Sequence, residues 1–440
     1  MWRGNDGRGL FAAPIESADP EMAALLIEEW KRQATTVNLI ASESYCPRAT
    51  IDAESSILVN KNATGYPGTR EVAGCAVVDT IERLAVERAR RLFDAEHANV
   101  QALASTVANV AVLRGLLKPG DTILSLDTLA GGHHSHGAPV HVSGQDYRVV
   151  TFGIDEVTNC IDPLAVQRLA EQVRPRMIIA GSTAYPRAID FGALRAVADS
   201  VGALLFADIA HVAGLVVAGL HCNPTPYADV VTTSTHKTLC GPRTGGLVLA
   251  KRIHAKAIDA AIFPGIQGAP GAHIIAGRAV LFELVGREEF RELMRAVVTN
   301  ARILAAALAD HGLSLYTGGT DTHMVVIDLR TEGWDGRAVE RVLESYGILS
   351  NATNLPLRRG ARGQRGLRLG TTAMTIRGMN EMDFRAVGTT LATILSLGTD
   401  RLVDRGLHQG ITKLAEEYLI LFGFVSARSL SASGGAAHGQ

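Results

Sequence analysis

Several common sequence signals are missing from this chain of 440 residues. It contains no Cys-x-x-Cys pair, and its five cysteines are scattered, which argues against a disulfide framework and against a thiolate metal site. Neither a P-loop nor a GxGxxG dinucleotide fingerprint occurs. Residues 1–22 lack the apolar core of a secretion signal, so we expect a cytoplasmic protein with reduced thiols.

An excess of charge of one sign is also missing, because 43 basic residues nearly balance 44 acidic ones. A nucleic-acid-binding protein would need a clustered basic excess, so no nucleic-acid partner is expected. The longest apolar stretch, residues 201–220, contains Asp208 and His211, which argues against a membrane span. Residues 62–64 match the N-glycosylation pattern, but without secretion they would not meet the glycosylation machinery.

The sequence does contain an alternation of short apolar runs with helical patterns from about residue 80 to residue 250. Residues 80–93 and 108–117 place apolar side chains at helical spacing. The runs expected to form strands are residues 121–127, 176–181, 203–210, 228–234 and 245–250. This alternation predicts an α/β fold with a large, mainly parallel sheet, helices on both faces, and a site beyond the carboxyl ends of the strands.

The chain is too long for one ordinary core, so we divide it into four parts. These are an N-terminal arm (1–45), a large domain (46–290), a smaller C-terminal α/β domain (291–425) and a small, polar tail predicted to be disordered (426–440). Helical patterns occur at 272–285, 301–312, 337–346, 380–397 and 410–424, and strand-like runs at 323–330 and 367–374.

Lysine is scarce, and one of the seven lysines has unusual neighbours. Lys237 follows an apolar run and lies among hydroxyl residues and glycines. A partly desolvated lysine beyond a strand end has a lowered pKa and can act as a nucleophilic amine. A lysine that snorkels from a loop would show the same local sequence, so both interpretations stay open.

Asp208 ends the apolar run that lies 29 positions before Lys237. A buried carboxylate needs a cationic partner. A pyridinium nitrogen could supply it, since pyridoxal-phosphate enzymes combine such a carboxylate with a Schiff-base lysine. A core aspartate held by backbone amides is the alternative.

Seven segments resemble, in order and spacing, the serine hydroxymethyltransferases, a family of fold-type-I pyridoxal-phosphate enzymes. They lie between about Asn38 and Leu397 and read NLIASES, GYPGTR, GGHHSHG, ADIAHVAGL, TTSTHKTLCGPRTGG, FPGIQGAP and LRLGTTAMTIRG. The resemblance implies a fold-type-I transferase with pyridoxal 5'-phosphate as cofactor and amino acids and aldehydes as substrates. It also implies a homodimer with shared active sites, or a larger assembly such as a tetramer.

Transferred residue by residue, the resemblance implies that Lys237 carries the cofactor and that Asp208 holds its pyridinium nitrogen. His133 would stack on the cofactor ring and act in catalysis. His211 and Thr183 would lie near the phenolic oxygen.

The same resemblance implies a phosphate site at a helix that begins near Ser105 and Thr106, where free amides and hydroxyls favour an anion. These residues could instead form an ordinary N-cap. Gly268 matches a phosphate contact from the neighbouring subunit, and His236, next to the lysine, is placed among the cofactor-binding residues.

The resemblance assigns the substrate carboxylate to Arg368, with Ser42 assisting. A bidentate guanidinium suits this task, whereas a pair with a surface acid is the plainer alternative. The histidine run at residues 133–136 could suggest metal ligands. No carboxylate or cysteine is near it in sequence, so no metal is expected.

The sequence departs from the family pattern at the groups that handle folate. Thr64 stands where the family has a glutamate, Glu71 and Val72 where it has two aromatic residues, and Thr353 where it has an asparagine. A hydroxyl cannot act as a general base near pH 7, so Glu71 is a candidate replacement. Alternatively, Glu71 pairs with Arg70 or faces solvent.

The residues that match the family's cofactor-binding groups are retained, whereas those that match its folate-handling groups are altered. This combination predicts a changed reaction. We expect aldol and retro-aldol transfer on a β-hydroxy amino acid, with a threonine-type transaldolase as the leading interpretation, which makes the use of tetrahydrofolate doubtful. The alternative is a folate-dependent hydroxymethyltransferase that acts on serine and glycine or on an α-methylserine-type substrate. An alternative of another class is a catalytically silent partner subunit.

Overall fold

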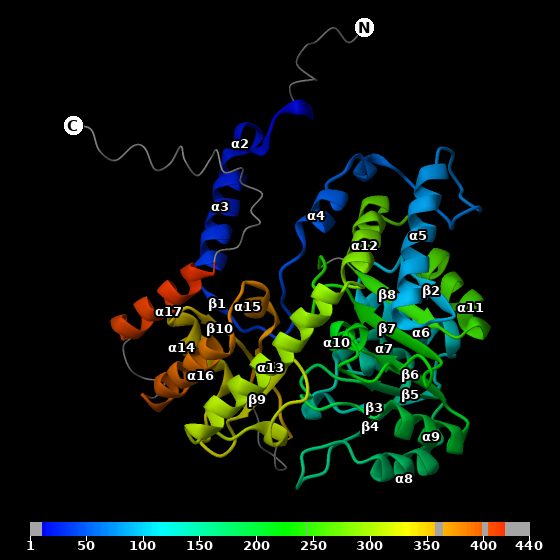
Figure 1. The fold of residues 1–440 in the computed structure, drawn as a ribbon. Helices are drawn as coiled ribbons and strands as arrows, with labels where there is room; N and C mark the ends of the chain where they lie inside the picture. The colour runs from blue at the N-terminus through cyan, green and yellow to red at the C-terminus, as the bar shows by residue number, and fades with distance from the viewer. Residues whose placement is uncertain (1–10, 244, 357–363, 398–403, 419–440) are drawn as a thin grey trace.

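The computed structural model describes residues 11–243, 245–356, 364–397 and 404–418 (Figure 1). The tail predicted at 426–440 lies outside the described residues. So does the end of the helix predicted at 410–424, whose first part falls in α17 (Arg405–Glu417).

A seven-stranded sheet forms the larger part of the molecule, with strand order β2-β8-β7-β6-β5-β3-β4. Neighbouring strands from β4 through β3, β5 and β6 to β7 pair in parallel, whereas β8 is antiparallel to both β7 and β2. The bounds are β2 His97–Asn99, β3 Thr122–Leu126, β4 Arg148–Phe152, β5 Met177–Gly181, β6 Leu204–Asp208, β7 Val230–Ser234 and β8 Gly246–Ala250. The predicted large, mainly parallel sheet is therefore confirmed.

Both faces of this sheet are buried because successive side chains of a strand point to opposite sides. Ile178 of β5 belongs to one apolar cluster, and its neighbours Met177 and Ile179 belong to another. The first cluster includes side chains of α5 (Ala76–Phe93), α8 (Pro163–Val173), α9 (Phe191–Val201) and α12 (Ala272–Leu284), and the second includes side chains of α6 (Ser105–Leu116) and α11 (Ala255–Ala260). In the described part of the chain, no helix combines the length and apolarity needed to cross a bilayer.

A second, three-stranded antiparallel sheet lies in the C-terminal part, with the order β11-β12-β9. Its strands are β9 Met324–Asp328, β11 Asn351–Thr353 and β12 Gly366–Gly370, and the helices nearby are α13 Glu288–Asp310, α14 Gly336–Ser345, α15 Thr372–Ile376 and α16 Glu381–Ser396. The strand predicted over 367–374 is shorter than expected. Thr371 takes a helical backbone conformation and donates its N–H to the His323 carbonyl, so α15 begins directly afterwards.

The end of the N-terminal arm packs with this C-terminal part. After α2 (Ile15–Ala18) and α3 (Pro20–Ala34), strand β1 (Val37–Asn38) pairs in parallel with β10 (Ile348–Leu349). Val37 and Leu39 are fully buried in the same apolar cluster as β9 and β12. The chain then crosses to α4 (Arg48–Glu54), which packs against α12, so residues 39–47 connect the C-terminal part with the larger part of the molecule (Figure 1).

Candidate active site

Strand direction brings most of the predicted cofactor residues to one edge of the large sheet. Thr183 follows β5, Asp208 ends β6, and Lys237 follows β7, and these three strands are parallel. Strand β2 runs in the direction of β7, because both are antiparallel to β8, so Ser105 at the start of α6 lies beyond the same edge. The carboxyl ends of parallel strands are where ligands bind in such sheets. We call this region the carboxyl-edge site.

Asp208 is held as an ionised carboxylate by side chains as well as by backbone. Its Oδ2 accepts hydrogen bonds from Asn109 Nδ2 at 2.8 Å and His136 Nε2 at 2.9 Å, and its Oδ1 accepts one from the Ala210 N–H at 3.0 Å. Burial alone would raise the pKa of Asp208, but the bond from His136 and the nearby cationic groups lower it below its ordinary value. If Asp208 were an ordinary core aspartate held by backbone amides, only the bond from the Ala210 N–H would be expected. Asp208 can therefore hold a protonated ring nitrogen.

Lys237 lies near this carboxylate without a direct bond to it. Among the described residues, no hydrogen bond or ion pair engages its Nζ. Burial lowers the pKa of Lys237 to about 8, although Asp208 acts in the opposite direction. A half-buried amine with a lowered pKa has a substantial neutral, nucleophilic fraction near neutral pH. Because burial lowers the pKa of the Lys237 amine, the structure favours a nucleophilic lysine over a lysine that snorkels from a loop into solvent.

The histidine run contributes two rings to the site. His133 Nδ1 lies 2.7 Å from Ser135 Oγ, and its ring centroid is 5.5 Å from that of His136. Burial lowers the pKa of His133 to about 4, so its ring is neutral and suited to stacking on an aromatic cofactor. The fold also brings Asp208 to these rings, and one ligand atom from each of the three residues lies within 4.8 Å of the others. No carboxylate is near the histidine run in sequence, but the fold places the Asp208 carboxylate beside it in space.

Arg368 on β12 reaches the carboxyl-edge site from the C-terminal sheet. Its Nε donates to Asn351 Oδ1 at 3.0 Å, and its Nη1 donates to the Thr183 carbonyl and, at 3.0 Å, to Thr183 Oγ1. Only 7% of the residue is exposed, and no carboxylate pairs with it in the described ranges. Burial lowers its pKa to about 10. A buried guanidinium with neutral partners only is a binding site for an anion.

The N-terminal arm passes along the same site. Ser44 Oγ donates to the His236 carbonyl at 2.9 Å, next to Lys237. Burial lowers the pKa of His236 to about 4, and its Nδ1 is buried without a partner. Ser42 is half-buried two residues earlier. The structure therefore places the arm close to the lysine, as the proposed role of Ser42 requires.

The start of α6 is open to an anion. Ser105 and Thr106 are its first two residues, and the N-cap is Ala104, which makes no side-chain capping bond. The hydroxyls of Ser105 and Thr106 therefore do not form the ordinary N-cap considered above, and the first N–H groups of the helix can bind a phosphate. Gly268 is exposed, and a Cβ at this position would have no atom within 4 Å.

The loop of residues 60–75 makes its contacts elsewhere. Thr64 Oγ1 donates to Asn62 Oδ1 at 2.7 Å, and the Glu71 N–H donates to the Thr64 carbonyl at 3.0 Å. The Glu71 side chain is exposed. Within the part of the chain that the structure describes, no bond joins Thr64 or Glu71 to Lys237.

Arg70 is the anchor of this loop and is not free to pair with Glu71. It donates to Asp79 Oδ1 at 2.8 Å and to Glu82 Oε2 at 2.6 Å, and its side chain is only 4% exposed. It also donates to the carbonyls of Ala63, at 2.7 Å, and Gly65. Of the two alternatives for Glu71, the structure shows the solvent-facing one.

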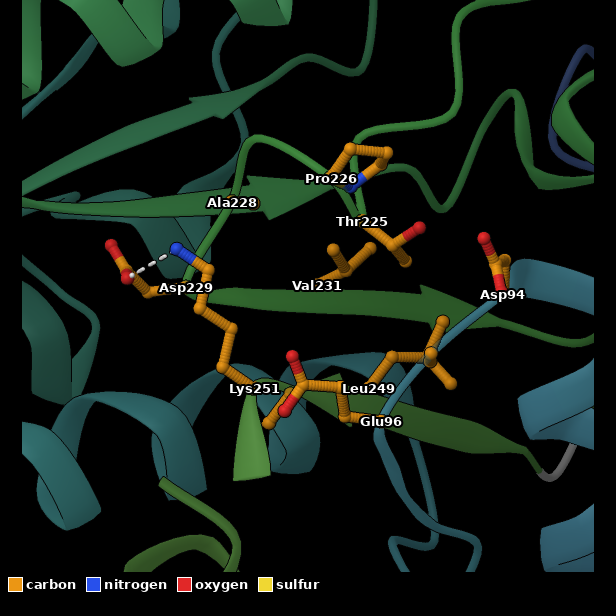
Figure 2. A pocket seen from close by; sticks show the side chains of 11 residues that line it. Asp94, Glu96, Thr225, Pro226, Ala228, Asp229, Val231, Leu249 and Lys251 are labelled. Atoms are coloured by element: carbon orange, nitrogen blue, oxygen red, sulfur yellow. Dashed lines mark hydrogen bonds and ion pairs between the residues drawn. The ribbon is translucent and has the colours of Figure 1, made fainter. Parts of the chain in front are cut away.

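A separate cavity of about 320 Å³ lies at the opposite edge of the sheet, beside the beginning of β7 and the end of β8 (Figure 2). Its central carboxylate, Asp229, is paired with Lys251 at 3.1 Å and with Arg195 at 2.8 Å. Asp229 therefore already has cationic partners within the chain, in contrast to Arg368 of the carboxyl-edge site, for which no carboxylate partner is found among the described residues.

Four side chains at the site were not singled out by the sequence. Asn109 and His136 hold Asp208, and Thr232 Oγ1 orients Asn109 through a bond of 2.6 Å to its Oδ1. The ring of His323 stacks on that of His211, with centroids 5.6 Å apart and an angle of 18° between the planes. Of these four residues, only His136 could have been found from the sequence, because it belongs to the histidine run at residues 133–136.

The residues present fit pyridoxal phosphate. Lys237 offers for the aldehyde an amine that has no bonded partner among the described residues, Asp208 offers a carboxylate for the ring nitrogen, and α6 offers an open N-terminus for the phosphate. Within the described ranges, His211 Nδ1 and His236 Nδ1 are buried without hydrogen-bond partners, as expected of polar atoms that face a ligand.

Comparison with known proteins identifies the family. The family model described as serine hydroxymethyltransferase matches residues 15–391. A protein of Coprothermobacter proteolyticus named serine hydroxymethyltransferase is 45% identical over 407 residues, which covers 92% of this chain and 98% of that protein. One of the same name from Nocardia farcinica is 47% identical over 406 residues, covering 91% of this chain and 94% of that protein.

Proposed function

Because the chain belongs to the serine hydroxymethyltransferase family, whose members are pyridoxal-phosphate-dependent transferases, we propose that it transfers a hydroxymethyl group between an amino acid and tetrahydrofolate. Serine and glycine are the proposed amino-acid pair, with an α-methylserine-type substrate as a variant. The observation that carries this proposal is the near-complete match to relatives with that printed name. It replaces the transaldolase as the leading interpretation.

The cofactor supplies the electron sink for cleavage at the amino-acid Cα. Around it, each protein group has a separate task. Arg368 would bind the substrate carboxylate and thereby fix the orientation of the bonds at Cα. Asp208, held by Asn109 and His136, would hold the ring nitrogen and favour its protonated form. The Lys237 amine, with its pKa of about 8, would attach the cofactor and can exchange a proton near neutral pH.

One proton transfer lacks the family's usual group. The β-hydroxyl must lose its proton when the aldehyde leaves, and Thr64 cannot take it near pH 7. Glu71 is exposed and makes no ion pair in the described ranges, and no bond there joins it to Lys237, so its carboxylate would serve this task only after the loop moves or from the other subunit of the proposed dimer.

A folate-independent threonine transaldolase is the second candidate. It is favoured by Thr64 and Thr353, which replace a family acid and amide. Thr353 lies buried on β11 opposite Gly366 and has no amide to offer to a folate ring.

One experiment separates the two candidates. The purified holoenzyme is incubated with serine, α-methylserine or threonine, with and without tetrahydrofolate, and with a second aldehyde. Hydroxymethyl transfer predicts folate-dependent release of glycine from serine, or of alanine from α-methylserine. Folate-independent release of acetaldehyde from threonine, together with a new β-hydroxy amino acid formed from the remaining glycine unit and the second aldehyde, would instead establish the transaldolase. Neither activity, together with no change in the cofactor's visible absorbance on adding an amino acid, would indicate the silent subunit.

A homodimer with shared sites is proposed for the assembly. An exposed Gly268 without neighbours is what a phosphate contact with another subunit requires. Sedimentation of the holoenzyme checks this, and a fully active monomer would contradict it. The cytoplasmic location stays a prediction from sequence.

A further inference from the structure

His323 is a buried imidazole to which the proposed function gives no role. It directly precedes β9 and is 0% exposed. Its Nε2 lies 3.0 Å from the Ala41 carbonyl oxygen, and a carbonyl can only accept, so this nitrogen carries the proton. Its ring lies against that of His211 in a stacked arrangement. His323 therefore touches the arm through one atom and the carboxyl-edge site through its face.

The arm is pinned to the C-terminal sheet directly before this contact. The Gly370 N–H donates to the Leu39 carbonyl at 2.7 Å. A Cβ on Gly370 would lie 2.4 Å from Ala41 Cα, so the two backbones are in close contact. Gly370 is two residues from Arg368 on β12, which ties the position of the arm to the strand that carries the guanidinium.

The arm is pinned again directly after Ser42. Ala41 is held by His323, and Ser44 Oγ is bonded to the His236 carbonyl at 2.9 Å. Ser42 is the residue assigned to the substrate carboxylate, and it lies in the span between these two bonds. Its position is thus fixed from both sides, and His323 supplies one of the two fixed points.

The chemical state of His323 suits a place near Arg368. Burial lowers the pKa of His323 to about 3, so the ring is neutral at working pH. Its Nδ1 is buried without a partner among the described residues. The ring can therefore support His211 without adding a charge.

We propose that His323 is a positioning residue for the amino-acid substrate. Its N–H fixes the Ala41 carbonyl and thereby Ser42, and its ring fixes the orientation of His211. This inference rests on the proposed function, because an amino-acid carboxylate is the ligand that Ser42 and Arg368 would share.

Two substitutions separate the hydrogen bond from the stack. His323→Phe keeps an aromatic ring against His211 but leaves the Ala41 carbonyl without its donor. His323→Gln keeps an N–H at similar reach but removes the ring. The first readout is the Kd of glycine and of serine, titrated through the visible absorbance of the bound cofactor. The second is deuterium uptake by residues 39–44 in the cofactor-free protein.

We expect His323→Phe to weaken both amino acids by about tenfold and to speed exchange in residues 39–44, because one positioned hydrogen bond is lost. His323→Gln should restore both readouts toward wild type while shifting the absorbance maximum of the bound cofactor, which the Phe variant leaves in place. His221→Phe is the matched control. His221 is also buried, bonds a backbone carbonyl at 3.1 Å and contacts an aromatic ring, but it does not touch the arm.

Unchanged amino-acid affinity and unchanged exchange in His323→Phe would overturn the proposal. So would equal losses in the Phe, Gln and His221 variants, since these would report a general loss of stability. Neither readout needs hydroxymethyl transfer. A positive result in an enzyme that releases no glycine from serine would therefore sink the proposed function and leave the role of His323 intact.

Discussion

The carboxyl-edge site and the loop of residues 60–75 each contain a buried arginine, and the two arginines are satisfied in opposite ways. Arg70 in the loop meets two carboxylates, Asp79 and Glu82. Arg368 in the site meets a threonine and an asparagine, both neutral. A buried charge whose partners are already in the chain holds the fold together, whereas one without a counter-charge leaves room for a ligand. The contrast favours a ligand site at Arg368 on physical grounds alone, independently of any relative.

The largest effect is expected from the unpaired amine of the carboxyl-edge site. Lys237→Ala should remove covalent attachment of the cofactor and lower turnover by roughly a thousandfold or more, because the nucleophile is lost. The visible absorbance band and the rate of glycine release measure this. The exposed Lys118→Ala serves as control and should leave both unchanged. An active Lys237→Ala enzyme would break the assignment.

The loop arginine should act on stability. Arg70→Met leaves Asp79 and Glu82 without their cation, and removing one partner of a buried ion pair costs about 3–5 kcal/mol. Denaturant unfolding monitored by circular dichroism gives the change in free energy. If Arg70→Met were as stable as the wild type but bound amino acids poorly, Arg70 would belong to the binding site and the contrast with Arg368 would be wrong.

The site arginine should act on affinity. Arg368→Lys keeps the positive charge but loses the planar fork, so amino-acid binding should weaken by about a hundredfold. The free energy of unfolding should change by less than about 1 kcal/mol, because no carboxylate is left unpaired. Titration of the cofactor absorbance with glycine and a parallel unfolding curve test both halves. A loss of stability as large as that of Arg70→Met would show that the two arginines are alike.

A dependence on pH is expected from the lowered pKa of Lys237. The neutral amine attacks the cofactor aldehyde, and its fraction rises with pH until it saturates above the pKa of about 8. The rate of covalent attachment to the cofactor-free protein should therefore rise about tenfold per pH unit below that value and then level off. Stopped-flow absorbance measures it. A rise that continues to pH 10 would mean an ordinary, solvated lysine.

The smallest effect on stability is expected at Glu71. This side chain is exposed and makes no ion pair in the described ranges, so Glu71→Gln should change the unfolding free energy by less than about 0.5 kcal/mol. Turnover then reports chemistry alone: a drop in kcat supports Glu71 as the base, and an unchanged kcat removes it from the mechanism. Thr64→Gln, measured in the same way, is the neighbouring control.

The sequence predicted the large sheet well because its strands are apolar on both faces and its helices are periodic. Local sequence also pointed to Lys237 and Asp208 as candidate cofactor residues, and the family resemblance added Arg368 as a candidate for the substrate carboxylate. The partners of Asp208 were missed, since Asn109 and His136 lie 99 and 72 positions away along the chain. Contacts of this kind follow from strand order, which local patterns do not encode.

The boundary of the arm shows the same limit. Residues 1–45 were predicted as an N-terminal arm, and Val37 and Leu39 of this arm are buried in the same apolar cluster as β9 and β12. Their burial depends on pairing with Ile348 and Leu349, and no periodicity links segments so distant.

The pairing of β1 with β10 also sets an order of events during synthesis. Val37 leaves the ribosome early, yet its partner Ile348 is made only after the whole large sheet. A contact between such distant positions carries a high cost in chain entropy and forms late in folding. We therefore expect nascent chains that end before β10 to contain the lysine and a folded large sheet but a loose arm. Binding of an amino acid would then be the last property that the growing chain acquires.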